Sequence, residues 1–146
     1  MFYKKFLNSI CMVTLAFLLI SGFVGCSSTY SPSSIYNNLT KAGYSVVEGE
    51  KIIFTDETDT SKLKGLQKIY RVNKGTNADK EVAYILVFDS ISNADSSNLS
   101  DLNLLDLSDF AKQNCGDSKK GNVSAGRYNN VVFAGFSAIK TTAGIK

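Results

Sequence analysis

The spacing of apolar residues predicts a series of short helices and strands along most of the chain. Ile35, Leu39 and Ala42 are three or four positions apart, so they share one face of a helix that ends at Gly43. Further on, short stretches with the two-residue period of a strand alternate with clusters of turn-forming residues. The strands predicted in this way are 44–48, 51–54, 69–72, 81–88, 122–127 and 131–134.

The segment 81–88 is the most apolar stretch after residue 26. Tyr84 and Leu86 lie on one of its faces, and Ala83 and Ile85 lie on the other. A strand that is apolar on both faces is typical of a position inside a sheet, either with cover on both sides or with one face packed and the other shielded. This segment is therefore predicted to be a central strand.

Helical segments interrupt and follow the predicted strands. The segment 90–110 is helical in parts, because Leu99, Leu102 and Leu105 fall near one stripe, and 137–142 can form a last short helix. Short turns between neighbouring strands favour an antiparallel sheet, and the interrupting helices pack on a sheet face. The predicted fold class is α+β, a two-layer, mainly antiparallel sheet with helices packed on it, for which a ferredoxin-like arrangement is one option.

The N-terminal segment has a different pattern from the rest of the chain. A positively charged head, 1–5, precedes an almost uncharged apolar run over 6–22. The apolar core, 10–20, is shorter than the roughly 18 to 20 residues that a membrane-spanning helix needs. This layout is typical of a secretory signal peptide.

The run ends in Phe23-Val24-Gly25-Cys26, which resembles the lipobox of bacterial prolipoproteins. The resemblance implies that residues 1–25 are removed as a lipoprotein signal peptide, and that fatty acyl chains such as palmitate anchor Cys26 to the membrane outside the cytoplasm. An uncleaved signal anchor, or cleavage with release, are the alternatives. The small polar residues that follow predict a flexible, lipid-anchored tether over 26–34 and a single α+β domain over 35–146.

Charge and composition exclude several functions. The chain carries a net charge of +3, and the signal segment contains two lysines and no acid, so its removal leaves +1. This near-neutral charge argues against nucleic acid as a partner. The chain has no histidine, which excludes the usual general base near neutral pH, histidine-dependent nucleophiles and most catalytic zinc sites. We therefore expect no cofactor.

Cysteine use is sparse. Cys11 lies in the signal segment, so lipidation of Cys26 leaves Cys115 as the single thiol of the mature chain. Such a cysteine is either a small, partly buried residue or a reactive thiol. If Cys26 is not lipidated, a disulfide between Cys26 and Cys115 is the other option.

Two further groups of residues are candidates for a site. Asp56, Glu57 and Asp59 cluster in one polar segment, which is either a solvated acidic turn or a weak calcium site. Tyr128 lies in a turn predicted over 128–130, next to Arg127, and these two residues form the best candidate for an exposed contact surface.

These observations favour a membrane-anchored lipoprotein that acts outside the cytoplasm as a non-catalytic binding or interaction module. Its partner would be an envelope protein or a glycan. A carboxylate-dependent hydrolase of cell-envelope glycans is one alternative, since paired acids can cleave glycosidic bonds. A small carrier of an apolar ligand is another.

Overall fold

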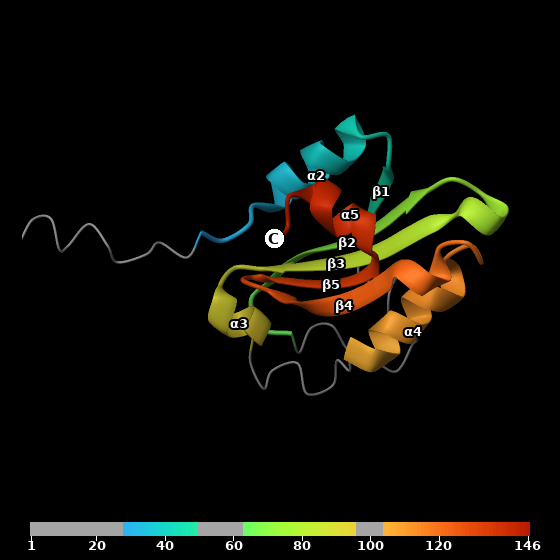
Figure 1. Ribbon diagram of the computed structural model, residues 1–146. Coiled ribbons are helices and arrows are strands. Elements are labelled where there is room, and N and C mark those ends of the chain that lie inside the picture. The colour runs from blue at the N-terminus through green and yellow to red at the C-terminus, as the bar shows by residue number, and fades with distance from the viewer. Residues whose placement is uncertain (1–27, 50–62, 96–103) are drawn as a thin grey trace, which may run out of the picture.

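Five strands form one sheet with helices packed against it in the computed structural model (Figure 1), which describes residues 28–49, 63–95 and 104–146. The elements in chain order are helix α2 (Pro32–Lys41), strands β1 (Ser45–Glu48) and β2 (Leu66–Lys74), the 3-10 turn η4 (Asn77–Asp79), strand β3 (Glu81–Phe88), helices α3 (Ile91–Asp95) and α4 (Leu104–Asn114), the 3-10 turn η6 (Lys120–Asn122), strands β4 (Val123–Tyr128) and β5 (Val131–Phe136), and helix α5 (Ser137–Ala143).

The strand order in the sheet is β1-β2-β3-β5-β4, and every neighbouring pair is antiparallel. The last strand in the chain, β5, lies between β3 and β4, so β1 and β4 form the two edges. The α+β class with an antiparallel sheet and packed helices is confirmed. The order of elements differs from the β-α-β-β-α-β order of the ferredoxin-like option.

The central strand β3 separates two hydrophobic clusters. Tyr84 and Leu86 face α3 and α4, whereas Ala83 and Ile85 face α2 and α5, and all four side chains are buried. Helices α2 and α5 form a layer on one face of the sheet, and helices α3 and α4 form a layer on the other face. The sheet therefore lies between the two pairs of helices (Figure 1). The prediction that 81–88 is a central strand is confirmed, with cover on both sides.

Several strands are longer than the sequence pattern predicted. β2 extends over Leu66–Lys74 because it pairs with β3 along nearly its whole length. β5 continues to Phe136, beyond the expected end at Ala134. Gly135 lies opposite Ala83, where a Cβ atom would collide with the Ala83 backbone and side chain. Gly135 therefore allows β5 and β3 to approach each other closely, and it does not end β5.

Two predictions about local structure lie outside the described residues. They are the strand 51–54 and the first part of the leucine stripe, Leu99 and Leu102.

The segment before α2 is part of the folded domain. The helix begins at Pro32, where proline suits the first helical position. Tyr30 packs against the cluster that faces α2 and α5 and is hydrogen-bonded to Asn130, while the Asn129 amide donates to the Ser28 carbonyl. The flexible tether predicted over 26–34 is wrong from Ser28 onward. We call these contacts of Ser28, Tyr30, Asn129 and Asn130 the N-terminal clasp.

Candidate functional site

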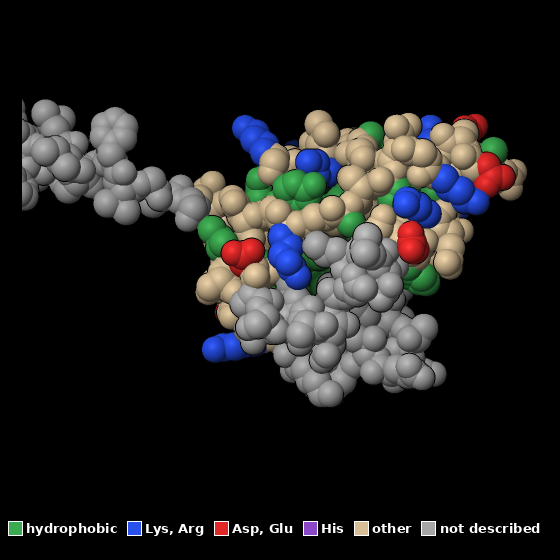
Figure 2. Space-filling model, turned by 60° about the horizontal axis from the view of Figure 1, so that its bottom comes forward, with side chains coloured by type: hydrophobic (Ala, Val, Ile, Leu, Met, Phe, Trp, Pro, Cys, Tyr) green, Lys and Arg blue, Asp and Glu red, His purple; other side chains and the backbone are tan. Residues whose placement is uncertain are grey.

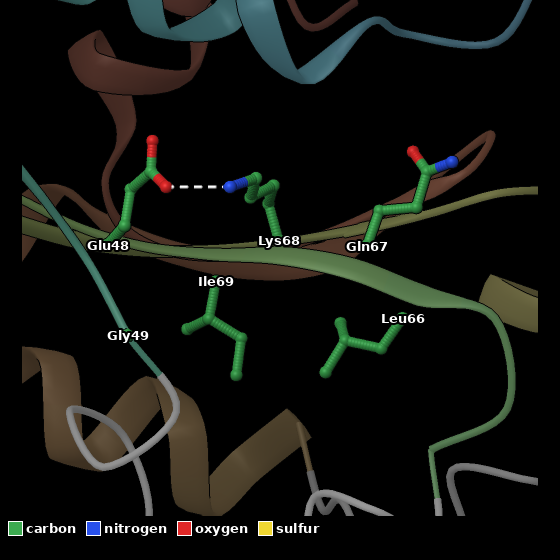
Figure 3. Close-up of a pocket in the computed structure, with 6 residues that line it drawn as sticks. All are labelled: Glu48, Gly49, Leu66, Gln67, Lys68 and Ile69. Atoms are coloured by element: carbon green, nitrogen blue, oxygen red, sulfur yellow. Dashed lines mark hydrogen bonds and ion pairs between the residues drawn. The ribbon is translucent and has the colours of Figure 1, made fainter.

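A cleft lies at the edge of the sheet where β1 ends and β2 continues. β1 pairs with β2 only from Tyr70 to Asn73, so the first part of β2 extends past the end of β1 at Glu48. The cleft has a volume of about 240 Å³ and is lined by Glu48, Gly49, Leu66, Gln67, Lys68 and Ile69 (Figure 3). We call it the edge cleft.

A β-bulge gives the edge cleft one polar and one apolar side. The register of β2 against β3 shifts between Leu66 and Lys68, so strict alternation of side chains is interrupted there. Gln67 and Lys68 consequently point to the same side of β2, and Leu66 and Ile69 point to the other (Figure 3). Leu66 and Ile69 belong to the core beneath α3 and α4, whereas Gln67 and Lys68 are exposed.

The charged groups of the edge cleft neutralise each other. Lys68 Nζ lies 2.8 Å from Glu48 Oε2, and both side chains are 46% exposed. An ion pair this exposed contributes at most about 1 kcal/mol to stability. Glu48 is the single carboxylate among the lining residues that the structure describes, and these do not supply the two opposed acids of a glycosidase.

The backbone at the edge cleft is suited to binding an extended segment. Within the described residues, no strand pairs with Leu66–Lys68 on the side away from β3. Free N–H and C=O groups on a sheet edge can pair with an added strand, and alternate side chains then enter neighbouring hollows. The Leu66 amide is already bonded to the Leu63 carbonyl, so pairing with an added peptide would use the backbone groups that follow it in β2.

A second polar cluster lies at the start of β3, around the half-buried Glu81. Tyr44 Oη donates a 2.7 Å hydrogen bond to Glu81 Oε2, and Lys119 Nζ lies 3.5 Å from Oε1. Burial, followed by the bond to Glu81, raises the pKa of Tyr44 to about 12. Tyr44 therefore stays protonated as a hydrogen-bond donor. The cluster joins the segment after α2 to the segment before β4, which is a structural role.

Arg127 and Tyr128 lie at the end of β4, on the sheet edge opposite β1, so they are not part of the edge cleft. Arg127 is exposed. Tyr128 is half-buried, and Lys140 Nζ lies 4.2 Å from the centre of its ring. The ring is thus covered on one face by a lysine of the same chain, which leaves Arg127 as the exposed member of the pair.

Cys26 and the acidic residues Asp56, Glu57 and Asp59 lie outside the described residues. Within 28–49, 63–95 and 104–146, no three acidic, cysteine or histidine side chains converge as metal ligands. In the same part of the chain, no helix is long and apolar enough to cross a membrane.

Cys115 is buried at the end of α4 and is a free thiol in the described part of the chain. Its Sγ lies 3.5 Å from the Val82 carbonyl oxygen, to which it donates a weak hydrogen bond. Burial raises the pKa of the Cys115 thiol, and this opposes formation of the reactive thiolate. Its surroundings are those of a core residue.

Comparisons with protein-family models, curated proteins and solved structures found no match to this chain.

The edge cleft and the N-terminal clasp are not evident from the sequence pattern. The adjacent polar residues Gln67 and Lys68 break the alternation just before Ile69, and this break was the available signal for a bulge. Asn129 and Asn130 have the composition of a turn. Their partners lie about 100 positions away, so no local pattern pointed to them.

Proposed function

We propose that this protein is a lipid-anchored, non-catalytic interaction module that acts outside the cytoplasm. The observation that carries the proposal is the charged head and short apolar run that end in Gly25-Cys26. Acyl chains on Cys26 would hold the domain at the membrane without a spanning helix, since two chains are enough for stable anchoring.

The non-catalytic part of the proposal is supported by how the described polar groups are used. The chain contains no histidine. Glu48 is paired with Lys68 in the edge cleft, and Glu81 accepts from Tyr44. Among the described residues that line the cleft, Glu48 has no second acid opposite it, which a hydrolase of the glycosidase type requires, and Glu81 lies outside the cleft.

The edge cleft supports a protein partner in preference to a glycan. Among the described strands, only β3 pairs with the first part of β2, whose remaining backbone groups fit an extended peptide, and Gln67 adds an exposed amide next to them. An envelope protein with an extended segment is the partner that these groups fit.

Acyl labelling tests the anchor. In cells fed with a traceable palmitate, the wild-type chain should be labelled and should fractionate with membranes, and Cys26→Ala should lose both properties. Cys115→Ala is the matched control and should keep them, because that thiol is buried in the domain. Labelled Cys26→Ala, or a mature terminus without acyl groups, would overturn the proposal.

Site-specific cross-linking tests the partner surface. The anchored chain would carry a photo-cross-linking residue in place of Gln67 or, as a control, in place of Gln113. Both glutamines are exposed, but Gln113 lies on α4 and away from the edge cleft. Adducts with one envelope protein from position 67 alone are expected. Equal adducts from both positions, or none from 67, would contradict a role for the cleft.

A further inference from the structure

The N-terminal clasp fixes the chain close to the proposed lipid-anchored residue. Asn130 Oδ1 accepts from the Tyr30 amide at 2.6 Å, and Asn130 Nδ2 donates to the Tyr30 carbonyl at 2.9 Å. Asn129 Nδ2 donates at 3.1 Å to the carbonyl of Ser28, which lies two residues before Tyr30. The phenol of Tyr30 also accepts a 2.9 Å bond from the Lys146 amide. The domain therefore holds its own N-terminal segment back to Ser28.

Only Ser27 separates the proposed anchor, Cys26, from Ser28. Two residue steps span at most about 7 Å, because a fully extended chain advances roughly 3.6 Å per residue. The linker is thus much too short to let the domain turn freely above a bilayer.

The clasp lies at one end of the sheet. Asn130 is bonded to Phe88, the last residue of β3, whereas Glu81 begins the same strand at the opposite end. Seven strand steps of about 3.4 Å place these two ends roughly 24 Å apart. Figure 1 shows the segment before α2 beside the β4–β5 turn, with the β2–β3 hairpin at the far end.

From the clasp and the length of the linker we infer that the clasp end of the domain rests against the lipid headgroups of the anchoring membrane. The end that carries Glu81, Asp117 and Lys119 then points away from the bilayer. This orientation depends on the proposed acylation of Cys26. It follows from covalent length and not from charge, because both signs of charge occur together on the surface: Figure 2 shows blue and red side chains side by side, and Lys120 Nζ lies 2.6 Å from Asp117 Oδ1.

Tryptophan probes test the orientation, because the chain contains no tryptophan. The full acylated protein would be placed in vesicles of phosphatidylethanolamine and phosphatidylglycerol that contain a headgroup-linked nitroxide quencher. Arg127→Trp puts an exposed probe two residues from the clasp turn, and Asp117→Trp puts one at the far end. The fractional loss of fluorescence should be several times greater for Arg127→Trp. Ser92→Trp on α3 is a second probe near the clasp end if the first does not fold.

A spacer variant provides the matched control. About 20 inserted Gly and Ser residues between Ser27 and Ser28 give a root-mean-square reach of about 25 Å, similar to the length of the sheet. The difference between the two probes should then disappear. Equal quenching without the spacer, in protein bound to vesicles, would overturn the orientation and leave the anchor intact. Vesicle binding that persists in Cys26→Ala would instead overturn the proposed function.

Discussion

Asn130 binds Phe88 through its main chain and its side chain together. The Phe88 amide donates to the Asn130 carbonyl at 2.8 Å, and Asn130 Nδ2 donates to the Phe88 carbonyl, also at 2.8 Å. The same carboxamide is hydrogen-bonded to the backbone amide and to the backbone carbonyl of Tyr30. One buried side chain thus joins the end of the central strand to the start of the domain.

Replacing Asn130 should therefore be costly. Asn130→Ala removes three hydrogen bonds and leaves the buried Phe88 carbonyl without its side-chain partner, so we expect a loss of about 2 to 4 kcal/mol in the free energy of unfolding. Urea unfolding followed by circular dichroism measures the loss. Asn37→Ala, at an exposed position of α2, is the control and should change stability by less than about 0.5 kcal/mol. Similar stabilities of the two variants would contradict the role of the clasp.

Gly116 should tolerate no side chain. A Cβ atom there would collide with the backbone of Ala78 and with the carbonyl of Asn77, in the turn before β3. Gly116→Ala should cost about 3 kcal/mol, because backbone atoms on both sides must move. Gly121 is the matched control, since no atom lies within 4 Å of a Cβ at that position. Thermal unfolding of the two variants compares them, and equal melting temperatures would show that the contact at Gly116 is not tight.

Tyr84 should make the fold sensitive to alkaline pH. Burial raises the pKa of Tyr84 to about 12, above its ordinary value of 10.0. The unfolded chain releases this proton as the pH rises past about 10, while the folded chain keeps it until about 12. The contribution to stability is thus complete below about pH 10 and is lost as the pH rises towards 12.

Tyr84→Phe tests this dependence. The phenylalanine ring fills the same space in the core beneath α4, and it lacks the phenol proton that titrates. Stability measured by urea unfolding should fall less steeply between about pH 10 and 12 in this variant than in the wild-type chain. An identical fall in both chains would exclude Tyr84 as a source of the alkaline sensitivity.

The Cys115 thiol should react slowly with thiol reagents in the folded protein. Its side chain is 5% exposed, and burial raises its pKa, so both access and thiolate formation are reduced. In a chain with Cys11 and Cys26 replaced by alanine, we expect a thiol reagent near pH 8 to react at least about tenfold more slowly with the folded protein than with the urea-unfolded protein. Equal rates in the two states would identify Cys115 as an accessible, reactive thiol.

The fold class could be predicted because it depends on local periodicity. The run from Glu81 to Phe88 is apolar at both even and odd positions, and a strand of this kind is stable only with cover on both faces. The four-residue spacing of Ile35 and Leu39 predicted α2, and both side chains are buried in the structure.

Strand lengths and the clasp could not be predicted in the same way. β2 begins at Leu66 because β3 offers it a partner there, although the polar pair Gln67 and Lys68 interrupts its pattern. The segment from Ser28 has the composition of a tether, and it is bound to the domain by residues about 100 positions away, among them Asn129 and Asn130.

The sequence by itself determined the central strand 81–88, the helix that carries Ile35 and Leu39, the α+β class, and the pattern that resembles a lipobox, since each depends on the order of neighbouring residues. The tertiary structure decided the position of β5 between β3 and β4, the edge cleft, and the attachment of Tyr30 to Asn130. These features depend on hydrogen bonds and contacts between residues far apart in the chain, and such pairings form only once the sheet has brought their partners together.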